Sequence, residues 1–282
     1  MNTRYVVLLL ALFVVPACES DSPTEPSNGN EVHYSALGAS DAIGFGGSSV
    51  CIPFNDCPNG TGYVQQIARR LRSEGKTVTL TNLGLPGAVL SPETQAIANS
   101  YGRQVLTNFL EQQLPFVPRD STLVTVFTGA NDVNAIGGAV ERGLGGSDPT
   151  NYIASQTQKF GADLRTLVED LQDRAPDARI VFLNLPNMAA FPYASGLSLA
   201  HKRWLQTLAV GYSAQINALA SSRVLVVDLM CNAMFYNASL ISNDGFHPND
   251  NGYTFLADVL YPAAANGTAM PPPSSCAQMT LF

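Results

Sequence analysis

One serine near the amino terminus and one short segment near the carboxyl terminus carry the residue types of nucleophilic catalysis. Ser40 stands in the segment GASD, and the segment DGFHP at positions 244–248 places Asp244 three residues before His247. A serine hydroxyl is a weak nucleophile, so it needs a base within reach and a group that orients the base. The pattern therefore indicates Ser40 as nucleophile, His247 as base and Asp244 as orienting acid. A histidine base predicts a rate that rises with pH as the imidazole loses its proton.

Attack by a serine creates an oxyanion, which needs hydrogen-bond donors that are already in place. Three donors are candidates: the backbone N–H of Ser40, the backbone N–H of Gly84 in NLGLPG, and the side-chain amide of Asn131 in GAND. A glycine allows the backbone to approach a substrate closely, and an asparagine offers an uncharged donor. These residues are the expected oxyanion hole.

Each of these residues also has a purely structural interpretation. Ser40 or Asp41 suits the N-cap of a helix, and Asn131 suits a cap or a turn. Gly84 suits a turn. The chemical interpretation depends on all the segments occurring together. Asp132 receives no catalytic role.

The elements that must position these residues follow from hydrophobic patterning. Buried strands are predicted by five short apolar runs, at 32–38, 77–83, 122–128, 179–185 and 224–229. Helical spacing occurs at 63–72, 152–171, 204–219 and 253–261. This alternation indicates an α/β fold whose parallel sheet is covered on both faces. In such sheets, loops at the carboxyl ends of the strands build the site, and the candidate residues all follow predicted strands.

The four segments resemble the SGNH hydrolases, also called GDSL-type esterases and lipases. They occur in the family's order over almost all of the mature chain, and DGFHP is the most specific of them. The resemblance implies a three-layer α/β/α, flavodoxin-like fold with a five-stranded parallel sheet. It also implies hydrolysis of carboxylic esters, acyl or acetyl esters of lipid or carbohydrate, through an acyl-serine. No metal or organic cofactor is implied.

The serine segment is the one that departs from the family pattern. The family often has Gly-Asp-Ser, whereas this chain has Gly38-Ala39-Ser40 followed by Asp41. The resemblance still implies that Ser40 is the nucleophile. The competing α/β-hydrolase scheme requires Gly-x-Ser-x-Gly, but position 42 is Ala42.

The amino terminus predicts export. Arg4 precedes an apolar run over 5–17, which is too short to span a membrane but suits a signal peptide. The run ends at Val-Pro-Ala before Cys18, which resembles a bacterial lipobox and implies lipidation of Cys18. Ordinary signal cleavage remains the alternative. Residues 1–17 are then a signal peptide, 18–30 a lipidated cysteine and polar tether, and 31–282 the hydrolase domain. The expected location is membrane-anchored, in the periplasm or on the cell surface of a bacterium.

Four cysteines remain after Cys18. An even number in an exported chain indicates two disulfides, and the favoured pairs are Cys51–Cys57 and Cys231–Cys276. The second pair would hold the proline-rich carboxyl-terminal tail on the domain. A zinc site is disfavoured, because no histidine lies at ligand spacing from these cysteines.

The amino-acid composition limits the classes of molecule that this protein is expected to bind. A net charge of −7 gives no basic surface for DNA or RNA. The expected partners are a small-molecule, lipid or carbohydrate ester and, through Cys18, a membrane. Two segments taken as loops, 133–149 and 186–199, are candidates for the substrate pocket, although the apolar side chains of the second suit core packing equally well. A non-catalytic surface binding lipoprotein on the same fold is the alternative function.

Overall fold

The fold is built on one parallel sheet. The computed structural model describes residues 29–282. Its five strands are β1 (Glu31–Leu37), β2 (Thr77–Asn82), β3 (Leu123–Val126), β4 (Arg179–Leu183) and β5 (Val224–Val227). They pair in the order β2-β1-β3-β4-β5, and every pairing is parallel. All five strands expected from the sequence are confirmed, and with them the α/β class.

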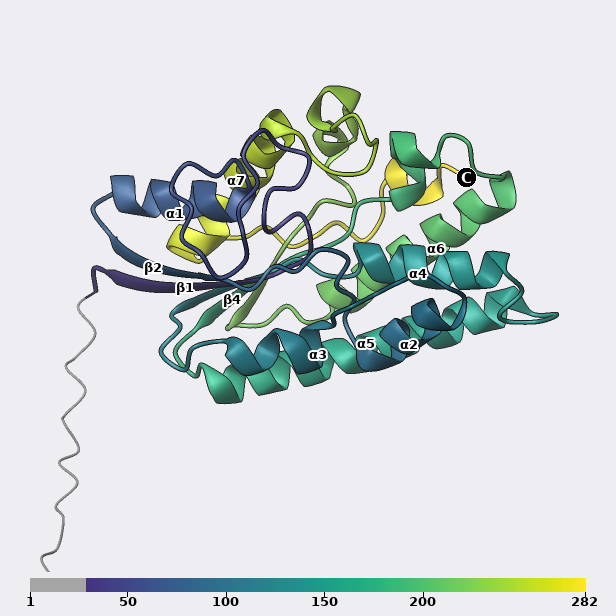
Figure 1. Ribbon diagram of the computed structural model, residues 1–282, viewed down its shortest axis with the longest axis horizontal. Helices are drawn as coiled ribbons and strands as arrows, with labels where there is room; N and C mark the ends of the chain where they lie inside the picture. Colours follow the sequence, from purple (N-terminus) through teal and green to yellow (C-terminus); the bar gives the residue numbers. More distant parts are fainter. Residues whose placement is uncertain (1–28) are drawn as a thin grey trace, which may run out of the picture.

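Helices cover both faces of the sheet (Figure 1). One face carries α1 (Tyr63–Ser73) and α7 (Asp250–Asn266), and the other carries α3 (Phe109–Gln112), α4 (Ala130–Glu141), α5 (Pro149–Arg174) and α6 (Leu199–Asn217). Helix α2 (Pro92–Ser100) packs against α4. Short 3-10 helices lie at 114–116, 188–190, 192–194, 233–236, 238–240 and 277–280. The predicted three-layer arrangement is therefore confirmed.

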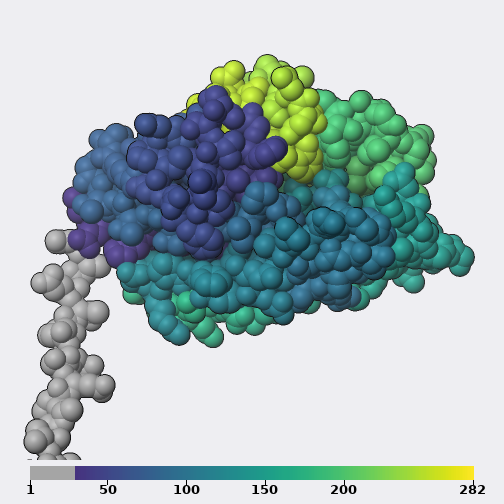
Figure 2. Space-filling model, viewed as in Figure 1, coloured from purple at the N-terminus to yellow at the C-terminus, as the bar shows by residue number. Residues whose placement is uncertain are grey.

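Burial explains why the central strands are almost entirely apolar. All four residues of β3 are buried, as are four of the five in β4. A strand covered on both faces has no solvent side, so the alternation of polar and apolar residues disappears. The first and last helices pack against each other. Segments from the two ends of the chain accordingly share one face of the molecule (Figure 2).

In the segment 133–149 the structure differs from the prediction made from the sequence. The sequence predicts a glycine-rich loop there, but residues 133–141 continue helix α4 and only residues 142–147 form turns. Two glycines let this helix pack closely. A Cβ on Gly137 would lie 2.7 Å from Leu205 Cδ2 of α6, and one on Gly138 would lie 3.1 Å from the Tyr101 hydroxyl. These glycines therefore serve helix packing rather than a flexible loop.

Both favoured disulfides are present. Cys51–Cys57 closes a short loop, and Cys231–Cys276 ties the carboxyl-terminal tail to the segment after β5. The tail is also held by the Asn187 side chain, which donates to the backbone carbonyl of Gln278. The predicted attachment of the tail is thus confirmed.

The predicted signal peptide, Cys18 and most of the tether lie outside the described residues. Within residues 29–282, no helix is long and apolar enough to cross a membrane.

Candidate active site

The candidate residues meet at the carboxyl edge of the sheet. Ser40 follows β1, and Asn131 lies in the first turn of α4, directly after β3. His247 lies in the loop that precedes α7. Loops at this edge converge because all five strands run in the same direction.

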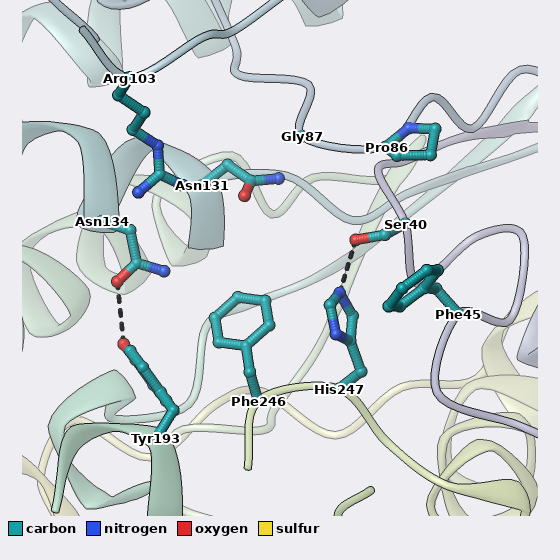
Figure 3. Close-up of a pocket in the computed structure, with 10 residues that line it drawn as sticks. All are labelled: Ser40, Phe45, Pro86, Gly87, Arg103, Asn131, Asn134, Tyr193, Phe246 and His247. Carbon is teal, nitrogen blue, oxygen red and sulfur yellow. Dashed lines mark hydrogen bonds between the residues drawn. The ribbon is translucent and has the colours of Figure 1, made fainter. Parts of the chain in front are cut away.

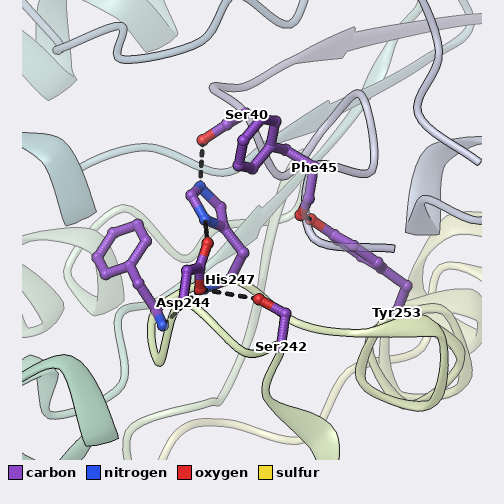
Figure 4. A network of polar contacts seen from close by, with 7 residues as sticks. Ser40, Phe45, Ser242, Asp244, His247 and Tyr253 are labelled. Carbon is purple, nitrogen blue, oxygen red and sulfur yellow. Dashed lines mark hydrogen bonds and ion pairs between the residues drawn. The ribbon is translucent and has the colours of Figure 1, made fainter. Parts of the chain in front are cut away.

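A continuous chain of hydrogen bonds joins Ser40, His247 and Asp244 (Figure 4). The Ser40 Oγ lies 2.8 Å from His247 Nε2. On the other side of the ring, His247 Nδ1 lies 2.6 Å from Asp244 Oδ2. A carboxylate accepts only, so Nδ1 carries the proton in this arrangement and Nε2 is left to accept from the serine hydroxyl.

The second oxygen of Asp244 organises the loop. Oδ1 accepts from the Ser242 hydroxyl at 2.8 Å, from the Phe246 N–H at 2.8 Å and from the His247 N–H at 2.9 Å. Partial burial opposes ionisation of this carboxyl, but the hydrogen bonds from Phe246, His247 and Ser242 outweigh it and lower its pKa to about 2. Asp244 therefore stays ionised across the neutral range.

A tight turn places Asp244 and His247 together. Gly245 adopts a φ of +76°, and a Cβ there would lie 2.7 Å from the Tyr193 backbone nitrogen. The Gly245 N–H donates to Ser242 O, and the Ser242 N–H donates to His247 O. These constraints explain why glycine and the Asp-x-x-His spacing occur together.

Aromatic rings flank the imidazole. The ring centroids of Phe45 and Phe246 lie 4.7 Å and 4.8 Å from that of His247. Phe45 is itself fixed by α7, because the Tyr253 hydroxyl donates to its carbonyl oxygen at 2.5 Å (Figure 4). The two rings restrict the orientation of the imidazole.

Ser40 does not cap a helix. The chain runs through consecutive turns after β1, and the next helix begins at Tyr63. The Phe45 N–H donates to Ser40 O, which closes the first of these turns. Ser40 is only 7% exposed, and its side chain lines a pocket. The helix-cap interpretation of this serine is therefore wrong.

Two of the three expected oxyanion donors reach the pocket. Ser40 and Asn131 both line it. The Asn131 Nδ2 donates one hydrogen to Ala88 O at 3.1 Å, which leaves its second N–H free to bind another acceptor. Within residues 29–282, the Ser40 backbone N–H has no hydrogen-bond acceptor.

Gly84 does not reach the pocket. Its N–H donates to Asn82 Oδ1 at 3.0 Å, and a Cβ there would lie 2.6 Å from Ala42 Cβ. Gly84 instead lets the loop after β2 pack against the turn that carries Ser40. The glycine that lines the pocket is Gly87, three residues later (Figure 3).

Gly87 belongs to a turn with a clear sequence signature. Pro86 and Gly87 are its central residues, the Ala88 N–H donates to Leu85 O at 3.1 Å, and Gly87 has a φ of +77°. Proline followed by a glycine with positive φ is typical of a type II turn. Within the described residues, the Gly87 N–H has no hydrogen-bond acceptor. The Pro-Gly pair was the signal that could have identified this glycine.

The pocket has a volume of about 430 Å³. It is lined by Ser40, Phe45, Pro86, Gly87, Arg103, Asn131, Asn134, Tyr193, Phe246 and His247 (Figure 3). The Tyr193 hydroxyl donates to Asn134 Oδ1 at 2.9 Å, so these two side chains form one polar part of the wall. Asn134 lies in the segment 133–149, which was a candidate for the substrate pocket, whereas no sequence motif pointed to Arg103.

The segment 186–199 contributes less to the pocket than it does to the core. Tyr193 lines the pocket, but Met188 and Phe191 are buried. Leu197 packs, half-buried, against the core. The core-packing interpretation holds for most of this segment. Tyr193 lines the pocket itself, and Pro186, Met188 and Phe191 line a smaller cavity that His247 also lines.

Two buried carboxyls lie beside the site. Burial raises the pKa of Asp41 and that of Asp132 to about 7, against the lowering effect of backbone hydrogen bonds. Asp132 Oδ1 accepts from the Leu90 N–H at 2.9 Å, which fastens the loop after β2 to the start of α4. Asp132 thus links a loop to a helix at this edge of the sheet and does not cap α4, whose N-cap is Gly129.

The other two histidines lie outside the pocket lining. His33 pairs with Asp120 at the surface. His201 is only 7% exposed, with Nδ1 3.0 Å from a Glu141 carboxylate oxygen. Within residues 29–282, no group of three or more His, Cys, Asp or Glu side chains is arranged to hold a metal ion.

One family model matches most of the chain. The model of the GDSL-like lipase/acylhydrolase family matches residues 36–255, a span that contains all the segments above. A search of curated protein sequences finds no match.

Solved structures share the fold. The lipase Lip_vut3 from a goat rumen metagenome has a TM-score of 0.55 and 18% identity, over 83% of this chain and 97% of that chain. The extracellular lipase of Streptomyces rimosus has a TM-score of 0.53 and 21% identity, over 83% of this chain and 100% of the other. Phospholipase A1 from Streptomyces albidoflavus NA297 has a TM-score of 0.51 and 18% identity, over 81% and 98%.

Proposed function

Because the chain belongs to the GDSL-like lipase/acylhydrolase family and is therefore an ester-bond hydrolase, we propose that Ser40 is its nucleophile. His247 is the general base, and Asp244 orients that base. The observation that carries the assignment is the unbroken hydrogen-bond chain from Ser40 Oγ through the imidazole to Asp244.

The reaction follows from this geometry. Ser40 Oγ attacks the ester carbonyl carbon while His247 Nε2 takes the hydroxyl proton. The tetrahedral intermediate collapses, the bond to the alcohol breaks, and His247 returns the proton to the departing alcohol. Water then attacks the acyl-serine with His247 again as base, which releases the acid and restores Ser40.

The proposed oxyanion hole consists of the Ser40 N–H, the Gly87 N–H and the second N–H of the Asn131 side chain. All three residues line the pocket. Gly87 replaces Gly84, whose N–H is already bonded to Asn82. Preorganised donors matter because they stabilise charge that develops only during the reaction.

Asp244 acts through the imidazole rather than on the substrate. Its Oδ2 holds the proton on Nδ1 and stabilises the imidazolium that forms during attack. With a pKa of about 2, this carboxylate keeps its charge at every pH where His247 can act as a base.

The proposed substrates are acyl or acetyl esters of a lipid or a carbohydrate. Apolar wall residues at Phe45, Pro86 and Phe246 suit an acyl chain or another apolar group next to the reacting carbon. A pocket of about 430 Å³ suits a short or medium chain better than a long one.

A panel of 4-nitrophenyl esters from acetate to decanoate tests this function. The wild type should hydrolyse the shorter members, and Ser40→Ala should lose all turnover. Ser100→Ala, which removes a hydroxyl exposed at the end of α2, is the matched control and should keep full activity. Unchanged turnover in Ser40→Ala would refute the nucleophile. Binding of esters by the wild type without turnover would favour the non-catalytic alternative.

The proposed location is a bacterial membrane surface, with residues 1–17 removed and Cys18 lipidated. The lipobox-like sequence before Cys18 supports this proposal. Mass spectrometry of the mature amino terminus should find Cys18 carrying acyl chains. An unmodified terminus at another residue would refute it.

A further inference from the structure

We propose that Arg103 binds an anionic group of the substrate, so that the enzyme prefers esters carrying a carboxylate or phosphate beside the scissile bond. This inference rests on the proposed function, because it assigns a specificity residue within the same pocket. The negative group lies on either the acyl or the alcohol side of the ester, and the shared chemistry is an oxyanion that accepts from a guanidinium.

The first evidence for this proposal is the charge of the side chains that line the pocket. Among the lining residues, Arg103 is the only one with a permanently charged side chain, and none has a carboxylate. The chain as a whole has a net charge of −7. A single cation retained in the pocket of an acidic protein favours negatively charged ligands over positive ones.

The guanidinium of Arg103 is unpaired. Within residues 29–282 it makes no hydrogen bond, and no carboxylate oxygen lies within 4.0 Å of it. Arg142, the neighbouring arginine, donates to Gly138 O and lies over the Tyr101 ring. Arg103 is half-buried, so its five donors are partly removed from water without gaining a partner.

The backbone around Arg103 is fixed. Gly102 has a φ of +87°, and the Arg103 N–H donates to Ala98 O, as in a glycine-terminated helix end. The Asn99 side chain accepts from the Val105 N–H at 2.9 Å and donates to Val105 O at 3.1 Å. The arginine therefore projects from an anchored segment.

The side chain extends toward Asn131 and Asn134 (Figure 3). Its charge also influences this wall, because it lowers the pKa of Tyr193 against the stronger raising effect of burial. A substrate anion there would meet the guanidinium together with neutral donors such as the Asn134 amide. Planar guanidinium groups bind carboxylates and phosphates with two parallel hydrogen bonds, which gives both affinity and orientation.

Two matched pairs of esters test the proposal. The acyl-side pair is 4-nitrophenyl hexanoate and mono-4-nitrophenyl adipate, which differ by a terminal carboxylate. The alcohol-side pair is methyl 4-acetoxybenzoate and 4-acetoxybenzoate. Values of kcat/KM are measured for wild type, Arg103→Gln, Arg103→Lys and the control Arg119→Gln, which removes an exposed positive charge elsewhere.

We expect Arg103→Gln to lower kcat/KM for the charged member of one pair about tenfold more than for its neutral partner. Tenfold corresponds to about 1.4 kcal/mol. The loss should lie mainly in KM, Arg103→Lys should restore part of it, and Arg119→Gln should leave the ratio unchanged. The affected pair identifies the side of the ester that Arg103 contacts.

Equal losses on charged and neutral esters would overturn the proposal, since they indicate that Arg103 only supports the fold. The same ratio change in Arg119→Gln would also overturn it, because overall charge would then explain the preference. Failure of the proposed function is distinguishable, because in that case Ser40→Ala keeps its activity on all four esters.

Discussion

Replacing Asp244 by Asn separates the chemistry of this carboxylate from its role in the loop. The Asn oxygen can still accept from Ser242, Phe246 and the His247 N–H, as Asp244 Oδ1 does. The amide nitrogen takes the place of Oδ2 and faces Nδ1–H, so two donors oppose each other. The imidazole relieves this by moving its proton to Nε2, where it can no longer accept from Ser40.

The size of the effect follows from the geometry. Two unit charges about 4 Å apart attract by about 1 kcal/mol in water and about 4 kcal/mol near a protein surface. The Asp244 side chain is 38% exposed and so lies between these two limits, which puts the lost stabilisation of the imidazolium at about 2 kcal/mol. The shift of the imidazole to the wrong tautomer raises the activation free energy by about as much again. The total increase is about 4 kcal/mol, which lowers kcat about a thousandfold. A buried acid in a serine-protease triad is worth about 10⁴-fold.

The assay compares Asp244→Asn with Asp244→Ala, using kcat on a 4-nitrophenyl ester and thermal unfolding. Asp244→Asn should lose about a thousandfold in kcat while its Tm stays near that of the wild type. Asp244→Ala should also lose the loop hydrogen bonds, at roughly 1 kcal/mol each, and unfold at a lower temperature. The reasoning is refuted if Asp244→Asn keeps more than a tenth of the wild-type kcat.

Three further predictions concern the oxyanion donor, a buried carboxyl and a disulfide. Asn131→Ala should lower kcat about 10²- to 10³-fold with little change in KM; a change confined to KM in steady-state kinetics would contradict its role. Burial raises the pKa of Asp132 to about 7, so the folded state holds this proton more tightly than the unfolded chain and stability falls as pH rises from about 4 to 7. The stability of Asp132→Asn relative to wild type should therefore increase between pH 5 and pH 8, by about 3 kcal/mol, and a difference that is flat with pH in urea unfolding would contradict this. The Cys231–Cys276 bridge spans 45 residues, so the double serine variant should lose about 4 kcal/mol of unfolding free energy, whereas an unchanged Tm would show that the tail is held by other contacts.

The parts of the fold that could be predicted from sequence are those with strong local patterns. The apolar runs identified the central strands β3 and β4 because a doubly covered sheet leaves few polar positions on them. The strand β2, TVTLTN, was identified by its β-branched residues instead. The DGFHP segment identified Asp244 and His247 because a tight turn fixes their spacing. Only the first half of the segment 133–149 was misassigned. Gly137 and Gly138 suggest a loop until the close packing of α4 against α6 is known, whereas residues 142–147 do form turns.

The pocket wall was less predictable than the nucleophile. Gly84 and Gly87 lie in one short loop. The hydrogen bond from Gly84 to Asn82 and the positive φ of Gly87 distinguish the packing glycine from the pocket glycine. Arg103 comes from a segment without a motif, and its place beside Asn131 depends on how the loop after α2 folds back over α4. Such long-range juxtapositions leave no local pattern in the sequence.

Labelling with a fluorophosphonate, which reacts preferentially with activated serines, tests the role of Ser40 most directly. We predict one adduct per chain, located by peptide mass spectrometry on Ser40, with labelling abolished in Ser40→Ala and strongly reduced in His247→Ala. Equal labelling of Ser40→Ala, or an adduct on a different serine, would contradict it.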